Sequence, residues 1–350
     1  MKKNIFFLCI SLLLCACNKG NNPSNSADQV QIQIEKETLA IVIHAGAGTI
    51  LKENISDSME LAYKTVLEKS VRSGYEILEN GGTSLDAVET SIRILEDSPL
   101  FNAGKGAVFT NAGTNELDAS IMEGKTKNAG AVAGVTTVKN PITLARAVME
   151  QSEHVMMARK GAETFAKEVG LTLVDPEYFY TESRMKALKR AQHRDSASKT
   201  SYYDPFAKDE KFGTVGCVAL DKSGNIAAGT STGGMTNKRW GRIGDSPIIG
   251  AGTYANNSTC GISATGWGEF FIRGVIAYDI SAMMEYAGLS LQEAANKVIH
   301  EKLPEMGGDG GIIGIDQKGN IATVFNTSGM FRASIDKTGT LSIELYSEDQ

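Results

Sequence analysis

The 350-residue chain has a hydrophobic content of 42% and carries a formal net charge of −6 at pH 7. This length and composition are sufficient for a globular domain with a large apolar core. Nucleic-acid binding is not expected, because it requires a clustered basic surface that this acidic chain does not offer.

The first 16 residues are typical of a bacterial lipoprotein signal peptide. Two lysines precede an apolar stretch, residues 5–14, that is too short for a membrane span, and the sequence LCAC ends at Cys17. This pattern predicts removal of residues 1–16, lipidation of Cys17 and a flexible tether over residues 17–37. We therefore expect an extracytoplasmic protein, in the periplasm or at the cell envelope, attached to the membrane only through the lipid. Ordinary secretion remains an alternative.

The next segment predicts one strand followed by two helices. Leu39–Ile43 is a short apolar strand, and a helix is expected from Ser58 to Leu78, ended by the pair Gly81-Gly82. Ser84 is predicted to cap a second helix that continues to about Glu96.

A third helical region is expected to begin at Pro141, a residue favoured in the first turn of a helix. Leu144, Val148, Val155 and Met156 are spaced as one apolar face of that region.

Residues 194–213 are predicted to be a flexible linker. The sequence from His193 to Phe212 is polar and mixed in charge, and it shows no hydrophobic period. The linker ends at Gly213, directly before a threonine.

A β-hairpin is expected from Val215 to Ser231, with its turn at Asp221–Asn225. The hairpin places Thr214 opposite Ser231 or Thr232, depending on whether Gly224 forms a bulge. Two hydroxyl groups would then face each other at the open end of the hairpin, as a nucleophile and an orienting partner require.

Thr214 has no histidine near it in the sequence to act as its base. If the bond between Gly213 and Thr214 were cut, the new α-amine would lie beside the threonine hydroxyl. Such an amine has a pKa of roughly 7.7–8.0, which suits a general base, and threonine activated by its own amine is a recurring nucleophile. A plain surface hairpin is the alternative interpretation.

The C-terminal half repeats this hairpin pattern. Gly311–Thr327 contains Asp316–Asn320, which matches the first turn, and two helices, about Gly268–Tyr286 and Leu291–Lys302, precede it. We expect the two hairpins to share one sheet. Helices, hairpins and helices in this order suit an α/β fold made of four layers.

Specific motifs extend over almost the whole mature chain, from about Thr38 to Tyr346, and they resemble the N-terminal-threonine hydrolases of the isoaspartyl peptidase and plant-type asparaginase family. These motifs are IHAGAG (43–48), SPLFNAGKGAVF (98–109), ELDASIMEG (116–124), AGAVAGV (129–135), GTVG (213–216), TSTGGMTNK (230–238), GRIGDSP (241–247), SATG (263–266) and FNTSGM (325–330).

The resemblance implies a role for each catalytic residue. Thr214 would be the nucleophile, Thr232 the hydroxyl that hydrogen-bonds it, and Thr265 and Gly266 the donors to an oxyanion. One such donor typically lowers the barrier by roughly 3–4 kcal/mol.

The same resemblance assigns substrate-binding residues. Arg242 would bind the α-carboxylate of the substrate and Asp245 its α-ammonium group, with Gly268 beside them.

Self-cleavage between Gly213 and Thr214 is also implied, with Asn102 in a supporting loop. Family members hold a structural sodium ion in this loop, and no cofactor takes part in catalysis. The sodium would here be bound by the backbone carbonyls of Leu95, Glu96, Ser98, Phe101, Ala103 and Lys105.

The implied fold is a four-layer α/β/β/α sandwich of the N-terminal nucleophile hydrolase type. Residues 38–213 would form the α subunit and residues 214–350 the β subunit of one folded domain. Family members commonly pair into a dimer of αβ heterodimers.

The implied function is a self-cleaving amidohydrolase that hydrolyses β-aspartyl dipeptides and L-asparagine. Two alternatives remain open: a glycosylasparaginase, which accepts a sugar-bearing amide, and a catalytically silent binding lipoprotein. Trp267, beside the oxyanion positions, leaves the substrate range in doubt.

The cysteines that remain after removal of the signal and lipidation of Cys17 are Cys217 and Cys260, which we expect to be buried free thiols; one disulfide is the alternative. His44 lies in the IHAGAG segment, which we expect to be a loop near the site.

Overall fold

A computed structural model describes residues 38–197 and 213–347. The predicted signal peptide, the lipidated Cys17, the tether of residues 17–37 and residues 198–212 of the predicted linker lie outside the described residues.

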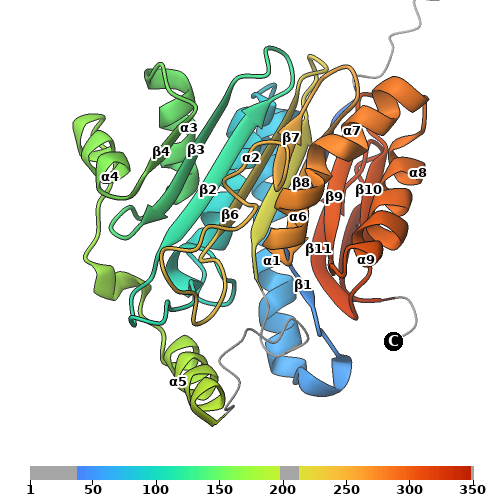
Figure 1. Cartoon of the computed structure of the whole chain (residues 1–350). Coiled ribbons are helices and arrows are strands. Elements are labelled where there is room, and N and C mark those ends of the chain that lie inside the picture. Colours follow the sequence, from blue (N-terminus) through green and yellow to red (C-terminus); the bar gives the residue numbers. More distant parts are fainter. Residues whose placement is uncertain (1–37, 198–212, 348–350) are drawn as a thin grey trace, which may run out of the picture. The chain divides into compact units, whose positions relative to one another are not determined.

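Two β-sheets form the centre of the fold (Figure 1). The larger sheet has the strand order β12-β11-β1-β5-β6-β2-β3-β4, and the smaller sheet has the order β10-β9-β8-β7. Neighbouring strands are antiparallel, except for the parallel pair β3 and β4. The strands are β1 (Ala40–Gly48), β2 (Leu117–Glu123), β3 (Ala129–Val135), β4 (Met156–Ala158), β5 (Val215–Leu220), β6 (Ile226–Thr232), β7 (Thr253–Ala255), β8 (Cys260–Gly266), β9 (Gly310–Asp316), β10 (Ile321–Phe325), β11 (Gly329–Ile335) and β12 (Leu341–Tyr346).

Helices cover the outer faces of both sheets. Helices α1, α2 and α3 pack on the larger sheet, α6, α7 and α8 pack on the smaller sheet, and the two sheets face each other. The predicted four-layer α/β/β/α sandwich is thereby confirmed. The helices are α1 (Asp57–Glu79), α2 (Ser84–Glu96), α3 (Pro141–Gln151), α4 (Arg159–Glu168), α5 (Glu182–Ala197), α6 (Gly268–Gly274), α7 (Ile276–Ala287), α8 (Leu291–Asn296) and α9 (Leu303–Glu305). Shorter turns of helix occur at Lys52–Asn54, Gly104–Gly106, Pro176–Phe179 and Lys297–Lys302.

Strand alternation divides the interior into two apolar cores. On β1, Ile41 and Ile43 join the core beneath α1 and α2, whereas Ala40 and Val42 join the core between the sheets. Successive side chains of a strand point to opposite faces, so each central strand contributes to both cores. The same alternation on β5 assigns Val215 to the helix-side core, and its neighbour Thr214 therefore faces the space between the sheets.

The two helices predicted after the first strand are confirmed, with one correction at the start of the second. Helix α2 spans Ser84–Glu96, but its N-cap is Thr83, whose side chain accepts a hydrogen bond from Asp86 N. Ser84 is instead the first helical residue, and its backbone N–H donates to Asp221 Oδ2 at 3.0 Å. Asp221, in the turn between β5 and β6, thus caps the first residue of α2 from a distant part of the chain.

The predicted apolar face after Pro141 is only half correct. Leu144 and Val148 are buried on α3, but Val155 and Met156 are 55% and 40% exposed. The helix ends at Gln151, so these two residues do not continue its period.

Two further boundaries differ from their predictions. The linker was expected from residue 194, but helix α5 continues to Ala197. The helix expected over Gly268–Tyr286 is broken into α6 and α7 at Val275, whose φ of 50° is left-handed.

The two similar hairpins do not share one sheet, contrary to the prediction. Asp221 Oδ1 accepts from the backbone N–H of Ser223 and Asn225, and Asp316 makes the equivalent pair of bonds in the second hairpin. Strands β5 and β6 nevertheless belong to the larger sheet, and β9 and β10 to the smaller one. Local turn chemistry determines a hairpin but not the sheet that the hairpin joins.

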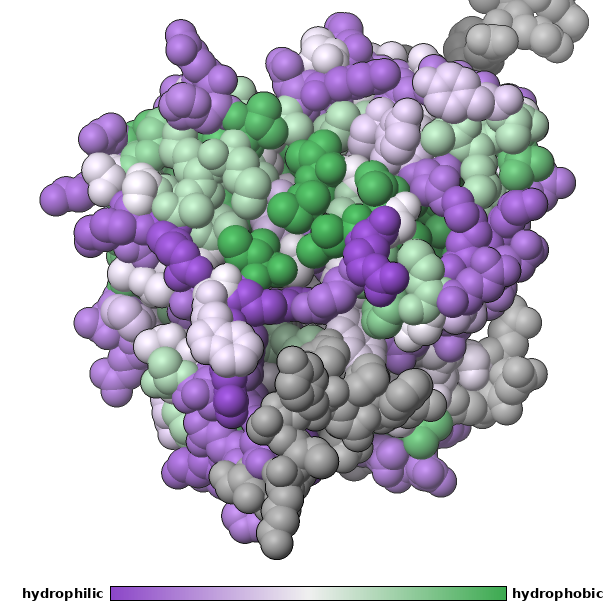
Figure 2. Space-filling view, viewed as in Figure 1, coloured by the Kyte–Doolittle hydropathy of each residue, from purple (hydrophilic) through white to green (hydrophobic). Residues whose placement is uncertain are grey.

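Cys217 and Cys260 are buried free thiols, as predicted. Within residues 38–197 and 213–347, no helix is long and apolar enough to cross a membrane. Figure 2 shows hydrophobic side chains gathered across the middle of one face, with hydrophilic side chains around them.

Glu96 ends helix α2 as a fully buried carboxyl group. Its Oε1 accepts hydrogen bonds from Ser231 Oγ at 2.6 Å and from Ile142 N at 3.0 Å. Burial raises the pKa of this carboxyl to about 8. The group therefore joins α2, the start of α3 and strand β6 as a neutral acid at pH 7.

We expect Glu96→Gln to cost less than Glu96→Leu, about 1 kcal/mol, because the amide oxygen still accepts both bonds while the amide NH2 takes the place of Oε2, which has no partner among the described residues. Glu96→Leu is expected to cost about 1–3 kcal/mol, since it leaves the buried Ser231 and Ile142 donors unsatisfied. Urea denaturation at pH 7 measures both, and equal stability of the two variants would contradict the structural role of these bonds.

Candidate active site

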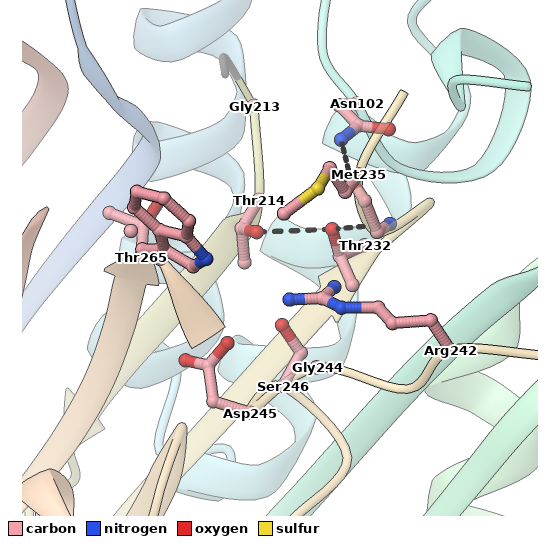
Figure 3. A pocket seen from close by; sticks show the side chains of 13 residues that line it. Asn102, Gly213, Thr214, Thr232, Met235, Arg242, Gly244, Asp245, Ser246 and Thr265 are labelled. Carbon is pink, nitrogen blue, oxygen red and sulfur yellow. Dashed lines mark hydrogen bonds between the residues drawn. The ribbon is translucent and has the colours of Figure 1, made fainter. Parts of the chain in front are cut away.

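The hairpin register places Thr214 opposite Thr232. Val215 pairs with Ser231 across β5 and β6, and Gly224 in the turn has a φ of 76°. Thr214 Oγ1 donates a hydrogen bond to Thr232 Oγ1 at 3.0 Å (Figure 3). The sequence left Ser231 and Thr232 open as partners, and the structure selects Thr232.

A pocket at these strand ends brings most of the predicted site residues together. Asn102, Gly213, Thr214, Thr232, Arg242, Asp245, Thr265 and Gly266 all line it. The sequence did not single out as site residues the other members of its lining, which are Gly234, Met235, Gly244, Ser246 and Trp267. Figure 3 shows Met235 beside Thr214.

Thr265 and Gly266 end strand β8 on the opposite sheet from Thr214. Thr265 Oγ1 accepts a hydrogen bond from Ala47 N at 3.3 Å, which leaves the hydroxyl proton to be donated elsewhere. Gly266 has a φ of 155°, and a Cβ there would lie 2.5 Å from the Asp309 carbonyl oxygen. A glycine is therefore required where the backbone N–H is predicted to bind an oxyanion.

Arg242 and Asp245 enter the pocket from the loop after β6, and Figure 3 shows both charged groups on the same side of Thr214 and Thr232. Arg242 donates through Nε and Nη2 to Glu269 at 2.9 and 2.8 Å. Asp245 Oδ2 has no hydrogen-bond partner among the described residues. Burial raises the pKa of Asp245 to about 7, and the nearby Arg242 opposes that shift.

Gly268 does not line the pocket but lies against both substrate-binding candidates. It is the first residue of α6, and a Cβ at this position would lie 2.7 Å from Asp245 Oδ1 and 2.9 Å from Arg242 Nη2. The absence of a side chain at Gly268 therefore allows the two charged groups to occupy their positions.

We expect the KM for L-asparagine to rise as the pH falls from 8 to 6. Asp245 is charged above its raised pKa of about 7 and protonated below it, and only the charged form attracts an α-ammonium group. The measurement is KM, and the inhibition constant of L-aspartate, at intervals across this range. Asp245→Asn is the control: its KM is expected to be high and independent of pH. A flat KM in the wild type would contradict the role of Asp245.

Lys238 and Asp118 form a buried ion pair that the sequence reasoning did not identify. Lys238 Nζ donates to the Glu116 carbonyl oxygen at 2.9 Å and lies 3.9 Å from Asp118 Oδ2. Both residues occur in motifs that resemble the family, and nothing else in the sequence indicated a role for them. The pair anchors the loop that begins at Gly233 and carries Arg242.

Asn102 and Gly213 lie in close contact at the predicted cleavage point. Asn102 donates through Nδ2 to the Gly234 carbonyl oxygen at 2.7 Å and accepts from Val108 N at 2.9 Å. Gly213 has a φ of 130°, and a Cβ there would lie only 2.3 Å from the Cβ of Asn102. On its other side, a Cβ at Gly46 would lie 2.7 Å from Gly213 N. The residue before Thr214 therefore has no room for a side chain.

The IHAGAG segment is a strand and not the expected loop. It belongs to β1, with an irregularity in pairing between His44 and Ala47. His44 is fully buried, and its Nδ1 lies 3.0 Å from the Thr214 carbonyl oxygen.

The end of α2 and the loop after it hold the residues of the predicted sodium site. A Cβ on Gly104 would lie 2.4 Å from the Glu96 carbonyl oxygen, and one on Gly106 would lie 2.0 Å from that of Phe101. Gly104 and Gly106 thus leave room for backbone carbonyl oxygens in this turn, and oxygen atoms are the ligands that a hard cation prefers. Among the described residues, no cluster of three or more His, Cys, Asp or Glu side chains is placed to hold a metal.

Comparison with known proteins agrees with this site. A protein family described as asparaginase matches residues 37–344. The isoaspartyl peptidase of Escherichia coli strain K12 is 53% identical over 293 residues, which cover 84% of this chain and 91% of that protein. The plant-type L-asparaginase of Pyrococcus abyssi is 42% identical over 300 residues, with coverage of 83% and 94%. The isoaspartyl peptidase/L-asparaginase of Xenopus laevis is 39% identical over 307 residues, with coverage of 87% and 94%. This chain therefore belongs to the asparaginase family of hydrolases, as its threonine hairpin and its motifs indicated.

Proposed function

We propose that the chain cleaves itself before Thr214 and then hydrolyses β-aspartyl dipeptides and L-asparagine. The observation that carries this proposal is the hydrogen bond between Thr214 and Thr232 in the pocket that also holds Thr265, Arg242 and Asp245. The names of the related enzymes support the same substrates.

Substrate binding depends on the two charged groups. Because Arg242 uses Nε and Nη2 for Glu269, its Nη1 donors are available to the α-carboxylate of an aspartyl residue. The unpartnered Asp245 Oδ2 accepts the α-ammonium group. The side-chain carbonyl of the substrate then faces Thr214.

Acylation transfers one proton from the nucleophile to the leaving group. Thr214 Oγ attacks the side-chain carbonyl carbon while its α-amine accepts the hydroxyl proton. The negative charge that develops on the carbonyl oxygen is stabilised by the Thr265 hydroxyl and the Gly266 N–H. The C–N bond then breaks, the leaving amine takes the proton from the α-amine, and an aspartyl ester of Thr214 remains.

Deacylation repeats these roles with water. The α-amine of Thr214 accepts a proton from a water molecule that attacks the ester carbon, and the same donors stabilise the oxyanion. The C–Oγ bond breaks, Thr214 Oγ regains the proton, and L-aspartate is released.

The proposal is tested by intact mass of the purified protein, together with aspartate release from β-aspartyl-leucine, L-asparagine and N4-(β-N-acetylglucosaminyl)-L-asparagine. We expect two fragments divided before Thr214 and release of aspartate from the first two compounds.

Trp267 is 4% exposed and lines the pocket, which favours small leaving groups over a sugar. Release mainly from the sugar-bearing compound would establish the glycosylasparaginase alternative instead. An uncleaved, inactive wild type would overturn the proposal; a silent binding protein is not supported, since the related proteins are enzymes.

We further propose that residues 38–213 and 214–350 become α and β subunits of one domain, and that two such heterodimers associate. The apolar zone on one face (Figure 2) supports association, because large apolar patches commonly mark interfaces.

The sodium site in the loop after α2 is proposed from its backbone oxygens, and the ion would be structural. The sequence LCAC before residue 18 supports export and lipidation at Cys17.

A further inference from the structure

His44 is buried between the two sheets and contacts the main chain of the nucleophile. Its Nδ1 lies 3.0 Å from the Thr214 carbonyl oxygen, and its Nε2 lies 3.0 Å from Ser263 Oγ. A carbonyl oxygen can only accept, so Nδ1 must carry the proton. Burial lowers the pKa of His44 to about 3, so the imidazole is neutral and Nε2 accepts from Ser263.

Four buried hydroxyl groups continue from His44 through the interior. Ser263 Oγ lies 2.7 Å from Thr230 Oγ1, Thr253 Oγ1 donates to Thr230 Oγ1 at 2.6 Å, and Ser120 Oγ lies 2.8 Å from Thr253 Oγ1. All four residues are 0% exposed. We call Ser120, Thr253, Thr230, Ser263 and His44 the hydroxyl chain.

The proton positions along the hydroxyl chain follow from His44. Because Nε2 takes the Ser263 proton, the bond between Ser263 and Thr230 uses the Thr230 proton, and Thr230 accepts from Thr253. Thr230 Oγ1 also lies 3.0 Å from the Gly252 carbonyl oxygen. Ser120 and Thr230 each contact a carbonyl oxygen as well as a neighbouring hydroxyl, so the single proton of each is shared between two acceptors. Every hydroxyl of the chain is thus hydrogen-bonded, as a stable buried polar network requires.

The far end of the chain reaches the substrate-binding loop. Ser120 Oγ also lies 2.6 Å from the carbonyl oxygen of Ser246, the residue after Asp245. At the end of the chain near Thr214, Gly216 has no room for a side chain: a Cβ there would lie 2.0 Å from Ser263 Oγ and 2.4 Å from His44 Nε2. The glycine two residues after Thr214 thus makes room for the bond between His44 and Ser263.

We propose that His44 is a positioning residue, which holds the Thr214 carbonyl through Nδ1–H and is itself oriented by the hydroxyl chain that extends to the Asp245 loop. This inference rests on the proposed role of Thr214 as nucleophile. Holding the carbonyl restricts rotation of the Thr214 backbone and so maintains the direction of its amine and hydroxyl. A misplaced nucleophile lowers the rate of the chemical step without a comparable loss of substrate binding.

Two substitutions of His44 test which nitrogen matters. In His44→Asn the side-chain amide lies near the former Nδ1 and can still donate to Thr214, whereas in His44→Gln it lies near the former Nε2 and cannot. We expect His44→Asn to keep kcat within about tenfold of the wild type and His44→Gln to lose about 10²-fold, with KM changed less than about threefold in both. The value of kcat is referred to the cleaved fraction, which intact mass gives. Equal losses of kcat in the two variants would overturn the proposal.

A second pair of variants separates positioning from general stability. Ser263→Ala breaks the chain, and Ser281→Ala removes another buried hydroxyl that shares a 2.6 Å hydrogen bond with Thr259 outside the chain. We expect similar decreases in Tm, but a roughly tenfold loss of kcat only in Ser263→Ala. Equal kcat in the two would refute the positioning role even if His44 variants fail to fold. Failure of the wild type to cleave or to release aspartate would instead refute the function proposed for Thr214.

Discussion

Thr214→Ala is expected to remain a single uncleaved chain and to release no aspartate from β-aspartyl-leucine or L-asparagine. The substitution removes the hydroxyl that lies 3.0 Å from Thr232 and that attacks in both self-cleavage and turnover. Loss of a nucleophile that acts as part of a catalytic unit lowers kcat by roughly 10⁵-fold or more. Intact mass after long incubation and an aspartate assay measure the two consequences.

Thr214→Ser is the matched variant, because it keeps the oxygen and loses only a methyl group. We expect it to cleave and to turn over substrate, although with a less restricted side-chain rotamer. If all variants keep the Tm of the wild type, the loss of cleavage and of aspartate release is caused by the missing hydroxyl and not by unfolding. Aspartate release by pure Thr214→Ala at a wild-type rate would show that another group is the nucleophile.

Gly213→Ala is expected to prevent self-cleavage although it leaves Thr214 in place. The backbone at Gly213 has a φ of 130°, which costs a side-chain-bearing residue about 1–3 kcal/mol. The new Cβ would also lie 2.3 Å from Asn102 Cβ, so the peptide bond before Thr214 must move away from its position. Because activity needs the α-amine that cleavage releases, the variant is expected to be inactive as well. A time course of intact mass follows the uncleaved chain.

Gly224→Ala is the control for this experiment. Gly224 has a φ of 76° in the turn of the same hairpin, but a Cβ there meets nothing within 4 Å. It therefore introduces backbone strain without the contact to Asn102, and we expect lower stability with normal cleavage. Normal cleavage of Gly213→Ala would show that the tight contact with Asn102 is not needed for the reaction.

Local features of the chain were predictable because neighbouring residues determine them. Asp221–Asn225 forms its turn through side-chain bonds to the next few backbone N–H groups, and Gly224 supplies the left-handed residue of that turn. The helix after Pro141 begins as predicted for the same reason. Its predicted extension to Met156 was wrong, since apolar spacing does not show where a helix ends.

Features that depend on distant partners were less predictable. The hairpins at Asp221 and Asp316 have the same turn bonds, yet they joined different sheets because packing against other strands decides that choice. The cap of α2 was misplaced by one residue, and no local pattern indicates that Asp221 binds Ser84 N. The bond between Ser84 and Asp221 joins residues 137 positions apart in the chain.

The sequence by itself determined the nucleophile hairpin, the family and the residues proposed for catalysis, because these depend on short motifs and on local turn geometry. The structure selected Thr232, and not Ser231, as the partner of Thr214, through the register that the turn gives this hairpin. Only the tertiary structure decided that His44 and four hydroxyl groups form a continuous chain behind the nucleophile. The physical reason is that a buried polar side chain takes its partner from whichever strand the fold places against it, and sequence spacing carries no record of that neighbour.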